Sequence, residues 1–416
     1  MTKILYLDWN SFAGEYMKEA WTQAGITVVA FPFPFNKEND RKNTRMDEEL
    51  TKSLVMTLMS DSFDALFSFN YFPIAAMAAK ACRIRYISWV YDSPYIQLYS
   101  KTIFYPTNDI RVFDRAEVRK LRTMGANTVS YLPMAADVEY YDTLVTNAEE
   151  SFVNKYSSDI SFVGAMYTEP RQQLYARLTA MSEYDKGYLE GIIEAQKHLY
   201  GQKMLEELLT PELIARMEKA SPVYLHPDGF ETKAWVYADY YLYRHVTAKE
   251  RTEIMTLLSE KGYDLKIYTH RQKETDENAD DKTFGKLHLS SDALAHMQGT
   301  VDYYKEAPFV YNNSKINLNI SLRSIGTGIP LRAFDIMGCG GFLLTNYQED
   351  FLEFFTPNED FVYYTDYEDL LKKIDYYLTH DKEREKIARN GYEKVKEKHT
   401  FKNRVLDLQK RFDAFP

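Results

Sequence analysis

The first third of the chain alternates short apolar segments with segments of helical spacing. Apolar runs rich in β-branched and aromatic residues predict strands, and they occur at residues 3–8, 26–31, 65–69, 85–91, 110–113 and 129–133. Residues with helical periodicity lie between most of them, at 13–24, 46–60 and 74–82. This order is typical of an α/β fold with a parallel sheet and right-handed crossovers.

Polar side chains follow three of these predicted strands. In parallel sheets, ligands bind outside the carboxyl ends of the strands, so these side chains are the first candidates for a binding cleft. They are Asp8, Trp9, Asn10 and Ser11 after the first strand, Asn70 and Tyr71 after the third, and Asp92, Ser93 and Pro94 after the fourth.

The chain of 416 residues is too long for one ordinary hydrophobic core, and its length predicts two domains. The polar, acidic stretch 140–156 is the candidate linker between a domain at 1–150 and a second domain at 157–399. Within the second domain, residues 182–261 are mostly helical and are interpreted as an insertion, after which a strand is expected at 264–269.

Composition excludes several classes of function. The formal net charge of −10 argues against a general nucleic-acid binder. The two cysteines, Cys82 and Cys339, give no disulfide framework, which favours a reducing compartment. The short apolar start and the lack of long apolar windows predict a cytoplasmic protein without an integral membrane segment. No His, Cys and Asp cluster has metal-ligand spacing.

A strand, a glycine-rich loop, a helix and another strand follow one another between Ser314 and Thr345. Gly326 and Gly328 allow the backbone to approach a ligand closely, and the helix that starts near Pro330 favours an anion at its N-terminus. Arg332, in the first turn, opposes the helix dipole and is expected to face an anion. The spacing alone also fits an ordinary strand-to-helix turn with a surface arginine.

Asp335 lies on the same helix face as Arg332. Its carboxylate fits a hydrogen-bond acceptor for ribose hydroxyls, and it fits a local pair with Arg332 equally well. Spacing does not separate these two interpretations.

The block from Ser314 to Thr345 resembles the donor-site segment of glycosyltransferases with the GT-B fold, and more narrowly of the family related to the spore maturation protein CgeB. Tyr91–Pro94, Tyr131–Ala135 and the helical region 376–404 resemble other parts of that family. The resemblance implies two Rossmann-like domains that face a central cleft, a helical insertion in the C-terminal domain, and a last helix at 400–412 that packs back on the first domain.

The resemblance also implies roles for individual residues. It implies a UDP-, GDP- or TDP-sugar donor in the C-terminal domain and an unidentified acceptor in the N-terminal domain. Because the sequence has no metal motif, we expect no metal or cofactor. Asp335 matches the ribose-binding carboxylate, and Arg332 matches the diphosphate-binding region. The remaining donor-side residues are Gly164, His270, Tyr303, Asn319, Ser321, Gly326, Thr327 and Gly328, and the acceptor-side residues are Trp9, Asn10, Asn70 and Tyr71.

The stereochemical course stays open. All eight histidines lie at His198 or later, so an inverting reaction needs a carboxylate base in the N-terminal domain. Asp92 is the first candidate and Asp8 the second, although Asp92 before Ser-Pro also fits a turn cap. Many retaining enzymes of the fold carry two Glu residues in the donor segment, and the first falls near Thr327. A nucleotide-sugar 2-epimerase and a non-catalytic nucleotide-sugar binder are the alternative functions.

Overall fold

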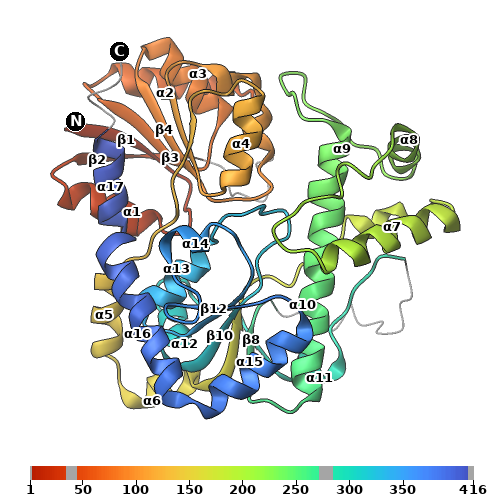
Figure 1. Ribbon diagram of the computed structural model, residues 1–416. Helices are drawn as coiled ribbons and strands as arrows, with labels where there is room; N and C mark the ends of the chain where they lie inside the picture. Colours follow the sequence, from red (N-terminus) through yellow and green to blue (C-terminus); the bar gives the residue numbers. More distant parts are fainter. Residues whose placement is uncertain (1, 34–44, 271–283, 411–416) are drawn as a thin grey trace.

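The computed structural model describes residues 2–33, 45–270 and 284–410, which form two parallel sheets of six strands each (Figure 1). The first sheet has the order β2-β1-β3-β4-β5-β6, and the second has the order β12-β11-β10-β7-β8-β9. The strands are β1 (Lys3–Asp8), β2 (Thr27–Pro32), β3 (Ala65–Phe69), β4 (Arg85–Val90), β5 (Asn108–Val112), β6 (Val129–Tyr131), β7 (Ser158–Val163), β8 (Leu265–Tyr268), β9 (Met297–Gly299), β10 (Ser314–Asn319), β11 (Leu343–Asn346) and β12 (Val362–Tyr364).

Helices flank both sheets, as the strand–helix order predicts. Around the first sheet lie α1 (Gly14–Gln23), α2 (Glu48–Met59), α3 (Pro73–Cys82) and α4 (Arg115–Thr123), with 3-10 turns at Ile96–Tyr99 and Lys101–Phe104. Around the second lie α5 (Val138–Thr146), α6 (Glu150–Tyr156), α11 (Ser291–Ala295), α12 (Ala307–Asn313), α13 (Leu331–Gly338), α14 (Phe351–Phe354), α15 (Tyr367–Thr379) and α16 (Asp381–Lys398).

The last helix, α17 (Phe401–Gln409), returns to the N-terminal domain and packs against α1 (Figure 1). A capping box between Thr400 and Asn403 fixes its start. The Phe401 ring lies 5.8 Å from that of Tyr16 and 6.0 Å from that of Trp89. The chain therefore crosses between the domains twice on this side, which we call the hinge side.

The region 182–261 forms a helical arm on the opposite side of the molecule (Figure 1). It contains α7 (Glu183–Lys197), α8 (Pro211–Ala220), α9 (Lys233–Val236), a π-helical turn (Tyr237–Leu242) and α10 (Tyr243–Glu260). A separate hydrophobic cluster fills the interior of the arm. It includes Tyr175 and Leu178, from a 3-10 turn (Tyr175–Leu178) that precedes the arm in sequence. The Trp235 ring lies 4.1 Å from that of Tyr99, so the arm also contacts the N-terminal domain.

The structure confirms the α/β fold class and places most strand ends within two residues of their predicted positions. The structure differs from the sequence prediction where the elements are short. The three-residue edge strands β9 and β12 carry too little pattern to be recognised in the sequence. The expected linker 140–156 is largely helical, because Asp137 caps α5 and the buried Tyr141 holds that helix against the C-terminal domain.

The carboxyl ends of the two sheets meet along an interdomain seam. Asp114, at the start of α4, accepts hydrogen bonds from the Gly326 N–H at 2.7 Å and the Thr327 N–H at 3.1 Å. Ser93 and Ser324 place their hydroxyl oxygens 3.3 Å apart across the same seam. These contacts hold the loop of residues 321–330 against the N-terminal domain.

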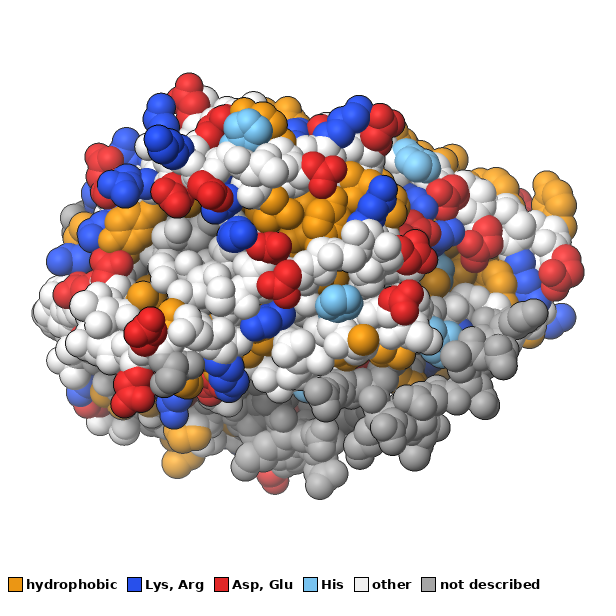
Figure 2. Space-filling model, turned by 90° about the horizontal axis from the view of Figure 1, so that it is seen from below, with side chains coloured by type: hydrophobic (Ala, Val, Ile, Leu, Met, Phe, Trp, Pro, Cys, Tyr) orange, Lys and Arg blue, Asp and Glu red, His pale blue; other side chains and the backbone are white. Residues whose placement is uncertain are grey.

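Acidic and basic side chains are interspersed on the face that Figure 2 shows. Within the described residues, no helix has the length and apolar character that a bilayer span requires.

Gly328 tests the importance of the seam. A Cβ atom there would lie 2.8 Å from the Phe113 carbonyl oxygen and 2.9 Å from the Asp114 Cα. Because backbone atoms cannot move aside cheaply, Gly328→Ala should lower the free energy of unfolding by about 1–3 kcal/mol, measured by urea denaturation. Gly191→Ala, in an open position of α7, is the matched control and should stabilise by about 0.5–1 kcal/mol. Equal effects of the two changes would contradict this account of the seam.

Candidate functional site

The topology of the second sheet marks one edge as the candidate site. Strands β7 and β10 are neighbours, and the chain leaves them toward opposite sides of the sheet, to β8 on one side and β11 on the other. Ligands of open α/β sheets bind outside the carboxyl ends of strands at such a switch point. Gly164 follows β7 directly, and Asn319 ends β10. Two predicted donor-side residues therefore lie at the switch point.

Arg332 reaches this edge from α13. Its Nη1 donates to the Asn319 Oδ1 at 3.1 Å. A Cβ atom at Gly164 would lie 2.7 Å from its Nη2, so glycine at 164 leaves the space that the guanidinium fills. The structure therefore brings Gly164, Asn319 and Arg332 together, as the sequence predicts.

Buried polar contacts fix the orientation of Arg332. Asn319 donates from Nδ2 to the Thr345 hydroxyl at 2.9 Å and to the Ser321 hydroxyl at 3.2 Å. The Ser321 backbone N–H donates to the Asn346 Oδ1 at 2.7 Å. Since these groups leave the Asn319 carbonyl free for Arg332, the amide acts as an oriented acceptor. Ser321 thus supports the site without facing it.

Two further arginines come from α10 of the helical arm. Arg251 shares the Phe162 ring with Arg332, and Arg244 shares the Tyr167 ring with Arg251. Arg251 is 2% exposed and donates to the carbonyl oxygens of Ala165 and Ile320, which follow β7 and β10. Its Cζ lies 5.4 Å from the Phe162 ring centre, as does that of Arg332. Arg244 and Arg251 both pack on the Tyr167 ring, at 5.8 and 5.1 Å.

Sequence reasoning missed Arg244 and Arg251 because it treated residues 182–261 only as an insertion. The available signal was an arginine within a largely buried helix: twelve residues of α10 are buried, and Arg251 is one of them. A buried cation in such a helix needs a partner outside the helix.

We call these three arginines the arginine cluster, and their hydrogen bonds go to amide and carbonyl oxygens. Among the described residues, none of Arg244, Arg251 and Arg332 forms an ion pair, and the Nε atoms of Arg244 and Arg251 are buried without a hydrogen-bond partner. Burial, with the nearby charge of Arg332, lowers the pKa of Arg251 to about 10, so it stays protonated at neutral pH. Buried charge without a partner is costly, and phosphate oxygens are the partners that guanidinium groups match best.

Asp335 is 2% exposed and lies where the two domains meet. Its Oδ1 accepts from the Tyr141 hydroxyl at 2.8 Å, and its Oδ2 accepts from the Tyr303 hydroxyl at 3.2 Å. Burial raises its pKa to about 7, while the tyrosine hydrogen bonds oppose that rise. Because Arg332 hydrogen-bonds Asn319 instead, the local Arg332–Asp335 pair considered from the sequence does not form.

Tyr303 covers Asp335 from the side of the N-terminal domain. Its ring lies 5.2 Å from that of Phe12, in the loop after β1, and the neighbouring Tyr304 hydroxyl donates to the Ser11 carbonyl at 3.4 Å. The Tyr303 hydroxyl thus occupies one hydrogen-bonding position on the Asp335 carboxylate. The predicted donor-side residues Tyr303 and Asp335 therefore lie in direct contact.

Asp92 lies near the start of the loop that follows β4, and it is exposed to solvent at the seam. Asn70, whose backbone φ is 57°, donates from Nδ2 to the Asp92 Oδ2 at 2.8 Å and accepts the Asp92 N–H at 3.3 Å. Protein atoms crowd the carboxyl on its other sides, and this desolvation raises its pKa to about 6. A proton acceptor near that pKa suits general base catalysis at neutral pH. Asp8, by contrast, pairs with Lys18 at 2.9 Å.

Several predicted residues have other roles in the structure. Gly326 and Gly328 approach α4 of the N-terminal domain and not an open ligand site, and Thr327 donates its hydroxyl to Asp114 at 3.1 Å. Tyr71 is fully buried and its hydroxyl contacts that of Thr102 at 2.8 Å, so it does not line a cleft.

The other predicted residues, Trp9, Asn10 and His270, differ in how far they are exposed to solvent. The Trp9 Nε1 donates to the Phe69 carbonyl at 2.9 Å, and Trp9 is 8% exposed. Asn10 is exposed and has a φ of 60°. His270 is exposed after β8, and it precedes residues 271–283, which the structure does not describe.

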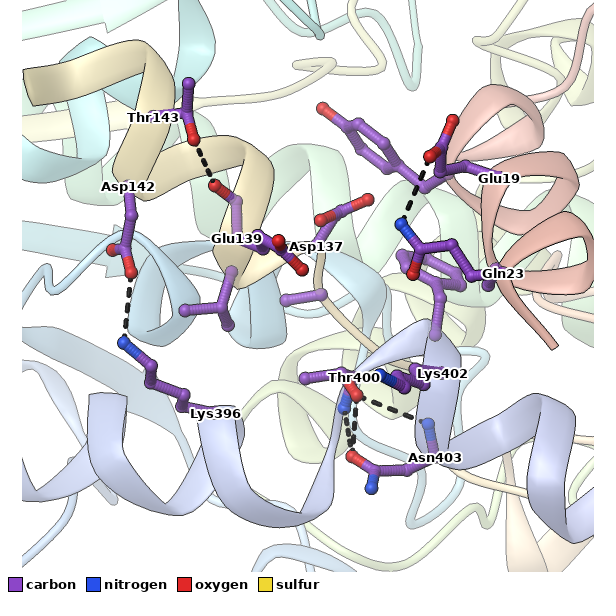
Figure 3. Close-up of a pocket in the computed structure, with 15 residues that line it drawn as sticks. Glu19, Gln23, Asp137, Glu139, Asp142, Thr143, Lys396, Thr400, Lys402 and Asn403 are labelled. Atoms are coloured by element: carbon purple, nitrogen blue, oxygen red, sulfur yellow. Dashed lines mark hydrogen bonds and ion pairs between the residues drawn. The ribbon is translucent and has the colours of Figure 1, made fainter. Parts of the chain in front are cut away.

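A pocket of about 410 Å³ lies on the hinge side, between α1, α5 and α17 (Figure 3). Its lining has a net negative charge, with the two lysines Lys396 and Lys402 against four acidic residues, Glu19, Asp137, Glu139 and Asp142. Burial raises the pKa of Asp137, and the negative charges of Glu139 and Glu19 add to that rise. Such a lining repels a diphosphate, which leaves the arginine cluster as the better anion site. Within residues 2–33, 45–270 and 284–410, no three His, Cys, Asp or Glu side chains gather as a metal site.

Residues 256–410 match the protein family described as glycosyl transferase-like. Among solved structures, the chain is similar to the Anabaena protein HepE in complex with UDP and glucose, with a TM-score of 0.50 and 10% identity over 98% of this chain and 99% of that one. It is also similar to sucrose-phosphate synthase from Thermosynechococcus elongatus, with a TM-score of 0.50 and 11% identity over 100% of both chains. No curated protein matches the chain in sequence.

These findings confirm the expected architecture: two six-stranded parallel sheets with flanking helices, in the GT-B fold. In sequence, residues 256–410 are similar to a glycosyl transferase-like domain, and the solved structures show the fold that carries it.

The raised pKa of Asp335 gives a prediction about stability. The folded protein holds this proton up to about pH 7, whereas an unfolded aspartate releases it near pH 4. The folded state therefore binds more protons between about pH 4 and 7, and this group makes stability fall as pH rises through that window. Asp335→Asn should remove up to one proton from the pH slope of the free energy of unfolding, measured by denaturation.

Tyr141→Phe is the companion variant. It removes a hydrogen bond that favours the charged carboxylate, so it should extend the pH window upward. Parallel stability curves for wild type and Asp335→Asn would show that Asp335 titrates normally in the folded protein.

Proposed function

We propose that the chain transfers a sugar from a nucleoside diphosphate sugar to an acceptor, and that the arginine cluster binds the diphosphate. The observation that carries the proposal is the position of Arg332 and Arg251 at the switch point of the second sheet, with Arg244 beside Arg251 on the Tyr167 ring. Within the described residues, none of the three forms an ion pair. Guanidinium groups there would stabilise the charge that develops on the leaving diphosphate.

Asp335 completes the proposed donor site. A ribose hydroxyl that replaces the Tyr303 hydroxyl would satisfy the same carboxylate oxygen. This exchange needs a movement of Tyr303, which is half-buried and packs on the exposed Phe12. Gly164 would let the donor approach beside Arg332, as proposed from the sequence.

The acceptor is proposed to bind on the side of the N-terminal domain, with Asp92 as the base. Its solvent access, its raised pKa and its fixed contact with Asn70 support this role over Asp8, which is neutralised by Lys18. Asn10 and Asn70 lie at the ends of neighbouring strands β1 and β3 and belong to the same proposed face. The acceptor itself is not identified by these contacts.

The relation to the CgeB family, metal independence and a cytoplasmic location stay predictions. UDP-sugars are the first donors to test, because the HepE structure contains UDP and glucose. Epimerisation of the donor without an acceptor, or binding without turnover, would identify the two alternative functions.

The donor site is tested through Arg332. Replacing Arg332 by Ala removes a guanidinium held by Asn319 and should weaken UDP binding about 10- to 100-fold, since a charged hydrogen bond contributes roughly 1.5–3 kcal/mol. Isothermal calorimetry with UDP measures the change. Arg119→Ala, which removes an exposed arginine of α4, is the matched control and should bind UDP as the wild type does. Equal affinities of all three proteins would remove the arginine cluster as the donor site.

The base is tested by comparing Asp92→Asn with Asp8→Asn. Asp92→Asn should leave UDP affinity unchanged and lower turnover about 100- to 10,000-fold, the usual range for loss of a general base. In the wild type, kcat/KM should rise as pH increases through about 6, because only the ionised carboxyl accepts a proton. Asp8→Asn should keep that profile. If Asp92→Asn turns over normally, the base lies elsewhere or the reaction is retaining.

A further inference from the structure

Tyr240 connects the helical arm to the loop that carries Asp92. It lies in the π-helical turn Tyr237–Leu242, in the arm of the C-terminal domain. Its hydroxyl accepts from the Ile96 N–H at 3.0 Å and donates to the Pro94 carbonyl at 3.1 Å. A single side chain of one domain therefore holds two backbone groups of the other, two and four residues after Asp92.

The ring of Tyr240 contacts the arginine cluster on its other side. The Arg244 Cζ lies 5.3 Å from the Tyr240 ring centre and 5.8 Å from that of Tyr167. The Arg244 Nη1 donates to the Gln172 side chain at 3.0 Å, which leaves its buried Nε without a partner. A phosphate bound by Arg244 would thus act on a guanidinium that packs directly against Tyr240.

The residue before Tyr240 makes a second connection to the same loop. Asp239 pairs with Lys203, whose Nζ also donates to the Ser324 carbonyl at 2.9 Å. The Ser324 hydroxyl lies 3.3 Å from that of Ser93, the residue after Asp92. Because a π-helical turn inserts an extra residue into a helix and often occurs at functional sites, it offers a local reason why adjacent side chains both reach the seam.

We propose that Tyr240 is a positioning residue that holds the Asp92 loop against the arm and couples it to donor binding at the arginine cluster. The inference rests on the proposed function for the identity of the donor and of the base. The structural part of the inference is that Tyr240 fixes residues 94–96, and this part depends only on the two hydrogen bonds. Occupation of the donor site would then order the acceptor side before transfer.

Tyr240→Phe and Tyr237→Phe form a matched pair of variants. Tyr237 lies in the same turn and donates its buried hydroxyl to the Ser221 carbonyl at 2.7 Å, inside the arm. Both changes remove one hydroxyl, but only Tyr240→Phe releases the Asp92 loop. Hydrogen exchange of the peptide that covers residues 92–99, measured with and without UDP, reports on the loop without any acceptor.

Tyr240→Phe should increase exchange in residues 92–99 and abolish the protection that UDP gives there, while its UDP affinity stays within about twofold of wild type. Hydrolysis of UDP-glucose should fall about tenfold or more. Its pH profile should shift to lower pH, because a looser loop hydrates Asp92. Tyr237→Phe should keep the wild-type exchange in this peptide and the wild-type pH profile.

The outcomes separate this inference from the proposed function. Unchanged exchange in Tyr240→Phe, or equal losses in both variants without a shift of the pH profile, would overturn the positioning role. If the wild type does not bind UDP, GDP or TDP, the proposed function fails, and exchange of the 92–99 peptide without nucleotide still decides whether Tyr240 holds the loop.

Discussion

The carboxylate of Asp114 determines how the two domains face each other. It accepts hydrogen bonds from the Gly326 N–H, the Thr327 N–H and the Thr327 hydroxyl, and it also accepts the Ala116 N–H of its own helix. Charge-assisted hydrogen bonds in a buried seam are stronger than exposed ones. The carboxyl ends of both sheets are held toward each other by this contact, so the acceptor-side loop and the donor-side loop meet.

The seam helps to explain why the arginine cluster has no carboxylate partner among the described residues. The backbone N–H of Gly326, in the 321–330 loop, donates to Asp114. Arg332, at the start of α13, lies against Asn319 and Gly164. Arg251 satisfies two carbonyl oxygens but no carboxylate. A fold that needed only stability would gain more from an apolar residue at such a buried position. The retained charges are therefore best explained by an anionic ligand, as the proposed diphosphate supplies.

The sequence predicts what local pattern determines and misses what distant packing determines. Strands β1 and β3 match their predicted ends because their apolar runs are buried and bounded by polar residues. The position of Arg332 follows from its place in α13. The role of Gly326 and Gly328 does not follow from the sequence. A glycine that approaches another domain has the same sequence pattern as one that approaches a phosphate. Tyr71 was placed in the cleft because nothing in the sequence reveals its contact with Thr102.

Thr327 links the seam to the chemistry of transfer. Its hydroxyl donates to Asp114 at 3.1 Å and accepts the Ala116 N–H at 3.2 Å, and it is 2% exposed. A glutamate at this position, where many retaining enzymes of the fold carry one, would bring a second negative charge against the Asp114 carboxylate in a buried place. The seam that sets the domain orientation thus disfavours that carboxylate. Under the proposed function, the acid–base group must therefore come from the N-terminal domain, where Asp92 lies beside the same seam.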